Sequence, residues 1–454
     1  MMGQTMLPSA AGLLLATPLL LAPAVLVFAL LLGTKPAAAV RACITIAVAM
    51  LGLNLIVWLM WSNLSEAAGA IAARTGFVRD VMDLGWPSAA AIAVGSTVGL
   101  FVIPAAIGIN LILLRLELTR TLNIDIWNFW HFAFVGALVA AATENLAMGL
   151  AAMVLAILFC LLMADWTARR MQSFYGVDGV SVPHLASVQI YPIAVGVNWL
   201  IDRIPGLRAV HLQPEDLSQR LGFLADPMVL GFGIGITLST FAYLDLADPL
   251  ASLHKVALCG VIFAAAMLIL PKMAQLLMEG LSPISTAAQG FAEKWTGGRE
   301  INVGLDSAIL IGHPSIMITS ALLVPISILL SLILPGNRVV LFADLTVIPF
   351  VIAMAAPVVQ GNIFRLVVIG VAMMVPGFYI AGHLASAFTT MALEAGFTKP
   401  AEATQITSIV DGFIWPSFAF TEIATSLGWV GIVMAFIVLG AGLFWSRHRH
   451  GFKA

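Results

Sequence analysis

Hydrophobic runs separated by short polar segments fill most of this chain. A helix needs about 20 apolar residues to cross a bilayer, and about eleven runs approach or exceed that length. They lie at roughly 10–32, 39–61, 87–114, 127–148, 149–168, 226–244, 252–276, 308–334, 340–358, 364–385 and 425–446. The pattern predicts an all-α polytopic membrane protein.

Four other segments are too polar to face lipid and too apolar for ordinary loops: 62–86, 181–204, 300–313 and 386–424. Non-helical backbone is tolerated at membrane depth only against protein or a water-filled cavity. We therefore expect re-entrant hairpins or short interfacial helices in these segments.

Composition excludes the soluble classes. Of the 454 residues, 61% are hydrophobic and 10% charged, with a mean hydropathy of +1.03, whereas a soluble domain carries about 25% charged residues. The net charge of -2 predicts no nucleic-acid partner. The cysteines Cys43, Cys160 and Cys259 lie far apart and suggest neither a disulfide framework nor a metal site. Motifs for nucleotides, zinc or a nucleophilic serine are missing, so we expect no metal and no cofactor.

Charge bias predicts the orientation. With eleven spans and a cytoplasmic C-terminus, the N-terminus lies outside. Of the 21 lysines and arginines, 16 then fall on the cytoplasmic side, as the positive-inside rule requires.

A faint internal repeat accompanies this topology. MDLGWPSAAAIA (82–93) precedes NIDIW (123–127) much as GLDSAILIGHPSI (304–316) precedes VLFADLTVIPF (340–350). The first unit starts outside and the second inside, which is the pattern of an inverted repeat with a substrate site near the midplane.

The first polar cluster places Asp125, Asn128 and His131 on one helical face. A helix entering the membrane would explain Asp125 by the helix dipole, and Trp127 and Trp130 as interfacial anchors. It does not explain His131, which lies deeper and is therefore a functional candidate.

The second cluster is His184, Ser187 and Gln189, bracketed by Pro183 and Pro192. Two prolines this close argue against one continuous helix. The segment is either a re-entrant element lining a cavity or a surface amphipathic helix with a solvated histidine.

The third cluster contains Asp306 and, seven residues on, His313. A carboxylate at membrane depth costs about 2.5–3.5 kcal/mol, so Asp306 must be paired, hydrated or functional. It could also cap the helix that starts near Ser307. For Asp344, capping is the preferred interpretation, and Glu144 could simply be hydrated.

Several motifs together resemble one family. They are DLGWP (83–87), NIDIWNFWH (123–131), VPH (182–184), YPIAV (191–195), IPG (204–206), GLDSAILIGH (304–313), PGNRVVLFADLTVI (335–348) and GNIFR (361–365). In this order they resemble the membrane component, enzyme IIC, of the galactitol-type bacterial phosphotransferase system (PTS), over roughly residues 80 to 450.

The resemblance implies one membrane domain over residues 1–454, in the bacterial inner membrane. Its transport core would come mainly from 62–200 and 300–424, and would move as an elevator against a scaffold of the remaining helices, which also forms a homodimer surrounded by lipid. The carrier would bind a polyol, galactitol being the first candidate. A separate IIB protein would donate the phosphoryl group from a phosphocysteine, itself supplied indirectly by IIA and HPr.

The resemblance also assigns residues. Asp306 would accept the hydroxyl proton, with His184 as its rival for this role. The other expected substrate ligands are His131, Asn128, Trp86, Gln189 and His313. The chain departs from the galactitol pattern at Leu185, Gln189, Tyr191 and Glu144. The changes at Leu185, Gln189 and Tyr191 bear on the identity of the polyol.

Two other functional classes remain open on the sequence. Asp306, His184 and Glu144 could form the relay of an ion- or proton-coupled transporter without phosphorylation. A passive channel or scaffold subunit would not need polar re-entrant segments.

Overall fold

The computed structural model describes residues 26–27, 29–31, 33–75, 80–216, 226–245, 247–296, 299–340, 344–397, 404–408 and 412–449. Its longer helices are α2 (Pro36–Thr75), α3 (Trp86–Gly95), α4 (Gly99–Arg115), α5 (Trp130–Thr143), α6 (Leu146–Tyr175), α8 (Ile190–Ile201), α11 (Pro227–Tyr243), α12 (Pro249–Thr296), α13 (Pro314–Ile333), α15 (Ile363–Glu394) and α17 (Trp415–Arg449). Short helical turns are η1 (Trp127–Phe129), α7 (Leu185–Val188), α9 (Pro205–Arg208), η3 (Ser307–Ile309), η4 (Leu345–Val347), α14 (Ile348–Ile352) and η5 (Ala353–Ala355).

Within these ranges, five helices are long and apolar enough to cross a membrane, or six if one bent pair counts as a span. This agrees with an all-α membrane protein. The five lie within α6, α12, α13, α15 and α17, and the bent pair is α3 with α4.

Three predicted segments differ from the structure. The span at 87–114 is not straight, because α3 and α4 meet at 86°. The span at 340–358 contains short turns instead of one helix, with residues 341–343 outside the described ranges. The segment 62–86 begins as a continuation of α2 up to Thr75, so a re-entrant hairpin there was wrong for that part. Apolar composition alone does not report where a helix breaks.

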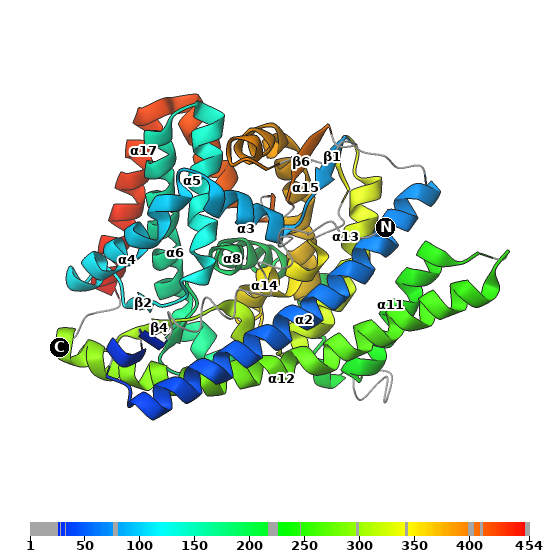
Figure 1. Ribbon diagram of the computed structural model, residues 1–454, viewed down its shortest axis with the longest axis horizontal. Helices are drawn as coiled ribbons and strands as arrows, with labels where there is room; N and C mark the ends of the chain where they lie inside the picture. The colour runs from blue at the N-terminus through cyan, green and yellow to red at the C-terminus, as the bar shows by residue number, and fades with distance from the viewer. Residues whose placement is uncertain are drawn as a thin grey trace, which may run out of the picture.

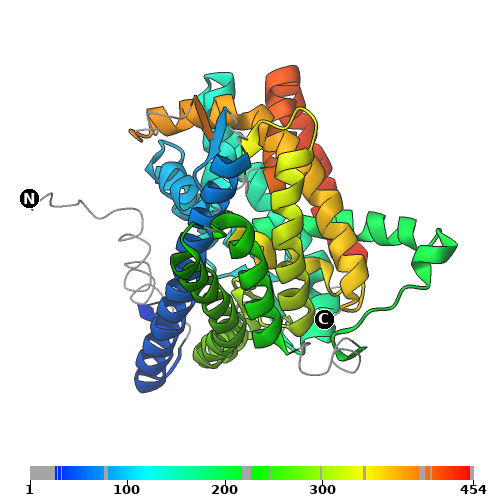
Figure 2. The ribbon, with the colours of Figure 1, turned by 90° about the vertical axis from the view of Figure 1, so that its right-hand side faces the viewer.

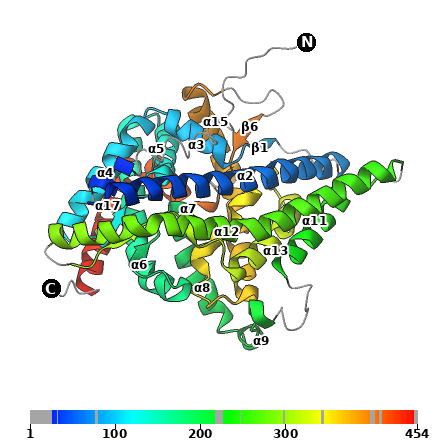
Figure 3. The ribbon, with the colours of Figure 1, turned by 60° about the horizontal axis from the view of Figure 1, so that its bottom comes forward.

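The helices form two packing groups. The first contains α2, α11 and α12, which lie side by side in Figures 1 and 3. At 1.5 Å per residue, α2 is about 60 Å and α12 about 72 Å long. Both exceed the thickness of a hydrocarbon core, about 30 Å.

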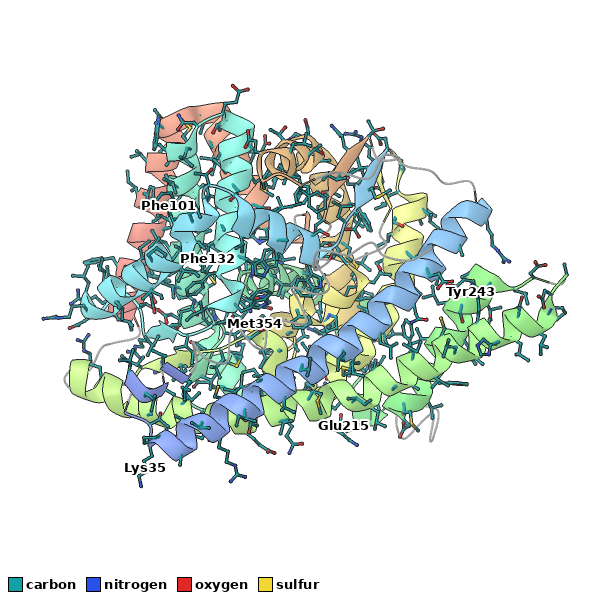
Figure 4. The ribbon with its side chains drawn as sticks, in the orientation of Figure 1. Lys35, Phe101, Phe132, Glu215, Tyr243 and Met354 are labelled. Carbon is teal, nitrogen blue, oxygen red and sulfur yellow. The ribbon has the colours of Figure 1, made fainter. Side chains whose placement is uncertain are left out.

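The second group is a bundle in which α5 packs on α3, α6, α15 and α17, and α13 packs on α15; Figure 2 shows α13 and α15 side by side. Phe132 and Met354 are completely or almost completely buried in its interior (Figure 4). In the hairpin of α5 and α6, a Cβ on Gly136 would lie 2.7 Å from the carbonyl oxygen of Gly149. Only glycine permits this approach.

Six very short strands form two parallel sheets. The strands are β1 (Val81–Asp83), β2 (Thr121–Asn123), β3 (Val180–Ser181), β4 (Asn302–Gly304), β5 (Val339–Val340) and β6 (Gln405–Thr407). One sheet has the order β5-β1-β6 and is called sheet A here; the other has the order β2-β4-β3 and is called sheet B. They lie at different ends of the molecule in Figure 1.

Both sheets direct their carboxyl ends into the protein. In sheet A the residues before the strands, such as Asp80 and Arg338, are exposed, whereas Asp344 and Ser408 beyond them are completely buried. Arg338 closes the exposed edge by bonding Asp80 and Gln405. The hydrogen bond that the Arg338 guanidinium donates to Asp80 raises the pKa of this guanidinium.

Candidate substrate site

The carboxyl edge of sheet B gathers residues from three distant parts of the chain. Strands β2, β3 and β4 end at Asn123, Ser181 and Gly304. Asp125, His184 and Asp306 follow them within two or three residues. Parallel strands bring such positions to one edge, which is where open parallel sheets place their ligands.

Asp125, Asn128 and His131 form one hydrogen-bonded unit. The Asn128 amide nitrogen donates to both Asp125 carboxylate oxygens, at 3.0 and 2.8 Å. Nδ1 of His131 lies 3.0 Å from the carbonyl oxygen of Asn128. Because a carbonyl can only accept, Nδ1 carries the proton, and neutral His131 has an acceptor lone pair on Nε2.

His184 is fixed in the same tautomer. The Ser187 hydroxyl donates to the carbonyl oxygen of Phe350 at 2.6 Å, so it must accept from Nδ1 of His184, 2.8 Å away. Ser307 also contacts Nδ1 of His184. The Nε2 lone pair of neutral His184 therefore remains available. His184 is buried, so the alternative of a solvated histidine on a surface helix was wrong.

The two histidines and Asp306 converge. The His131 and His184 rings have centroids 4.8 Å apart, and Trp130 stacks on His131 at 3.8 Å. Trp130 is buried and is thus not an interfacial anchor. Asp306 interacts electrostatically with His131. Unlike buried Asp125, residue Asp306 keeps partial exposure.

Asp306 also caps a helical turn, as the sequence predicted. Its Oδ1 accepts from the backbone N–H of Ala308 at 2.9 Å, at the start of η3. This bond fixes the carboxylate while leaving acceptor capacity for a ligand.

Close packing positions the His184 segment. A Cβ on Gly304 would lie 2.7 Å from Cγ of Pro183 and 3.0 Å from Cα of Asn123. The bare Gly304 backbone therefore lets β2, β4 and the turn carrying His184 approach one another.

Sheet A holds a second buried carboxylate cluster that the sequence pattern alone did not reveal. Asp344 accepts from the Trp86 backbone N–H at 2.6 Å and from the Ser408 hydroxyl at 2.5 Å, and its own N–H donates to Asp83 at 3.2 Å. Its side chain does not cap η4, so the capping interpretation of Asp344 was wrong. Trp86, an expected substrate ligand, is half-buried here. One signal in the sequence could have revealed this cluster: the internal repeat, in which Asp83, Asp125, Asp306 and Asp344 occupy matching positions.

The other expected ligands lie differently. Gln189 is completely buried; its amide nitrogen donates to the carbonyl oxygen of Ala186, and its amide oxygen has no partner among the described residues. His313 caps α13 and contacts Phe174 and Tyr175 near the end of α6. Glu144 ends α5 in a left-handed conformation with φ of 51°.

No group of three or more His, Cys, Asp or Glu side chains in the described ranges is arranged to hold a metal ion. The chemistry available at sheet B is that of hydrogen-bond acceptors: two imidazole nitrogens and a partly exposed carboxylate.

Comparisons with known proteins identify the family. Residues 13–403 match the EIIC-GAT family model, described as "PTS system sugar-specific permease component". The chain is 34% identical over 375 residues to the PTS system galactitol-specific EIIC component of Escherichia coli K12, covering 83% of this chain and 82% of the relative. The counterpart in Escherichia coli O157:H7 gives the same values. The chain is also 32% identical over 411 residues to a putative permease IIC component of Escherichia coli K12, covering 90% of this chain and 92% of the relative. The family that the sequence motifs suggested is thus confirmed: the chain belongs to the EIIC-GAT family of sugar-specific phosphotransferase permeases.

Proposed function

We propose that this PTS IIC permease carries a polyol, galactitol being the first candidate, across the bacterial inner membrane and presents it to a phosphorylated IIB protein. The family and the galactitol-specific relatives support the substrate class. The same family disfavours the ion-coupled alternative.

The acceptor cluster at the carboxyl edge of sheet B is the observation that supports this function most directly. A polyol offers hydroxyl protons along its whole length. Nε2 of His131, Nε2 of His184 and the Asp306 carboxylate are acceptors for such protons. Trp86 lies at sheet A, where its backbone N–H bonds Asp344, so its expected stacking on the substrate stays a prediction.

In the proposed transfer, a substrate hydroxyl oxygen attacks the phosphorus atom of the IIB phosphocysteine. The new O–P bond forms as the S–P bond breaks, and the cysteine leaves as a thiolate. The hydroxyl proton moves to Asp306, or to Nε2 of His184. Phosphoryl transfer depends mainly on positioning, which the Ser187 and Ala308 bonds provide for these two groups.

The sheets support an inverted repeat. In the first half, β1 lies in sheet A and β2 and β3 in sheet B; in the second half, β4 lies in sheet B and β5 and β6 in sheet A. Exchange of the two sheets relates the halves. We infer a pseudo-two-fold arrangement with about eleven spans, an external N-terminus and a cytoplasmic C-terminus.

The packing groups support an elevator. Helix α12 contacts η3, next to Asp306, and α2 contacts η4, next to Asp344. The candidate site therefore lies where the bundle meets the long helices. We infer that α2, α11 and α12 form the scaffold and the dimer contact, and that the bundle moves against them. The inferred scaffold therefore includes residues 62–75 at the end of α2, which the expected limits 62–200 and 300–424 assigned to the transport core.

Proteoliposomes test the function. Purified protein is supplied with labelled galactitol outside and phosphorylated IIB on the cytoplasmic side. We expect labelled galactitol phosphate to form inside only when phosphorylated IIB is present. Accumulation of free galactitol, driven by a pH gradient and indifferent to IIB, would overturn the proposal. Product from another polyol alone would replace galactitol and keep the mechanism.

A further inference from the structure

A polar pocket lies at the amino edge of sheet B, opposite the carboxylate and histidine cluster. It is lined by Leu118, Thr119, Arg120, Asp165, Trp166, Ala168, Arg169, Asn302, Ser446 and Arg447. These residues come from the loop before β2, from α6, from the start of β4 and from the end of α17. The carboxylate and histidine cluster follows the same strands at their other ends, so the two sites are separate. Strand β2, which separates Arg120 from the residues before Asp125, has three residues, which corresponds to roughly 10 Å of extended chain.

The pocket has the size of a small oxyanion. Its volume is about 50 Å³. A water molecule needs roughly 10–15 Å³ on this measure, so the pocket holds about three to five water-sized groups. A phosphate group, with its four oxygens, is of this size.

Its charge favours an anion. Three arginines and one carboxylate line it, and that carboxylate is already bonded within the protein. Asp165 accepts from the backbone N–H of Arg120 at 3.2 Å and from the Thr121 hydroxyl at 2.8 Å. The Arg447 guanidinium donates to the carbonyl oxygen of Leu116 at 3.2 Å and lies 3.4 Å from a Glu117 oxygen.

Arg169 gives the pocket its unused donor. It is exposed, and its guanidinium has no hydrogen-bond or ion-pair partner among the residues that the structure describes. Arginine presents a planar fork of N–H groups that matches phosphate oxygens. The neighbouring Arg170 does not line the pocket and donates to the Tyr191 hydroxyl at 3.3 Å.

We propose that this pocket binds a phosphate-bearing anion through Arg169, with Arg120 and Arg447 supplying further positive charge. This inference rests on the proposed function in one respect only, the proposed topology. In that topology the charge bias puts this surface on the cytoplasmic side of the membrane. Two sources share the chemistry: the headgroup of an anionic phospholipid and a soluble phosphate or phosphate ester. Basic pockets between transmembrane helices on the cytoplasmic side commonly bind anionic headgroups.

The test uses the full chain purified in a neutral detergent. One arm counts phosphatidylglycerol molecules that remain bound in native mass spectrometry, with phosphatidylcholine as the neutral reference. The other arm measures the rise in thermal unfolding temperature on adding inorganic phosphate, against chloride at equal ionic strength. Each arm compares the wild type with Arg169→Gln, Arg169→Lys and the matched control Arg170→Gln.

We expect at least one probe to bind the wild type and the Arg170→Gln variant, and to bind Arg169→Gln at least about tenfold more weakly, because a charged hydrogen bond is lost. Arg169→Lys keeps the charge, so it should retain intermediate binding; it also shows that the position tolerates substitution.

Binding of phosphatidylglycerol alone identifies the lipid source, and binding of phosphate alone the soluble one. Equal binding by Arg169→Gln and the wild type, equal weakening in Arg170→Gln, or no binding of either probe overturns the inference. Polyol phosphorylation is measured separately, so failure of the proposed function leaves this result intact.

Discussion

The two histidines of the site owe their protonation pattern to backbone carbonyls. His131 donates directly to the carbonyl oxygen of Asn128, and His184 donates through the Ser187 hydroxyl, which itself donates to Phe350. Each arrangement fixes Nδ1–H and leaves Nε2 as an acceptor. The site therefore presents hydrogen-bond acceptors, which match ligands whose hydroxyl groups donate hydrogen bonds.

The substitution His184→Asn separates the roles of the two imidazole nitrogens. The asparagine amide can replace Nδ1–H toward Ser187, but it has no atom at the position of Nε2. We expect the His184→Asn variant to fold and to phosphorylate polyol about 10²–10⁴-fold more slowly, the usual size of a general-base or positioning loss. Initial rates of product formation with phosphorylated IIB measure this effect.

The control for this substitution is His254→Asn, because His254 is exposed on α12. Its rate should equal that of the wild type. An unchanged rate in His184→Asn would remove His184 from the mechanism.

At the scale of elements, the site depends on how closely three short strands and their turns approach. Gly304 lies against Pro183 and Asn123 with no room for a methyl group. Backbone and a proline ring cannot move aside as a flexible side chain would, so any added atom must displace the His184 turn or the sheet.

We therefore expect Gly304→Ala to lower stability by about 1–3 kcal/mol and to weaken polyol binding. Thermal unfolding in detergent and equilibrium binding of labelled galactitol report the two effects. Gly196→Ala is the matched control, because no atom lies within 4 Å of the added Cβ there. If Gly304→Ala behaves like Gly196→Ala in both measurements, close packing at Gly304 does not position the site.

Much of this arrangement was within reach of the sequence. Intramembrane Asp and His residues at helical spacing drew attention to Asp125, Asn128 and His131. Capping preference predicted that Asp306 caps the turn starting near Ser307, and its carboxylate accepts there from the Ala308 N–H. Two- and three-residue strands show no measurable alternation, so sheets A and B were not predicted. Their pairing joins distant segments, and with it the contacts of Asp83, Asp344 and Ser408 were missed.

At the scale of the whole molecule, each sheet begins near one surface and ends inside. Basic residues gather before sheet B, where Arg120, Arg169 and Arg447 lie. The proposed inverted repeat then puts the start of sheet A at the external surface. If the membrane side of one sheet's exposed end is known, the proposed repeat gives the side of the other. A single experiment therefore tests the orientation of both sheets.

Cysteine labelling measures these sides. Thr404 lies just before β6 and Ser173 near the end of α6, and both are exposed. An impermeant maleimide added to intact cells should label Thr404→Cys, but label Ser173→Cys only after permeabilisation. Cys43, Cys160 and Cys259 are buried, so background labelling should be low. The reverse pattern would invert the proposed topology.

The most direct test of the proposed mechanism concerns Asp306, the partly exposed carboxylate proposed to accept the hydroxyl proton. Asparagine keeps the cap on Ala308 but is not a base. Galactitol binding and IIB-dependent phosphorylation are measured on the same Asp306→Asn preparation, with exposed Asp178→Asn as control. We expect binding within about tenfold of the wild type and phosphorylation slower by about 10²–10⁴-fold. Phosphorylation at the wild-type rate would contradict this role of Asp306.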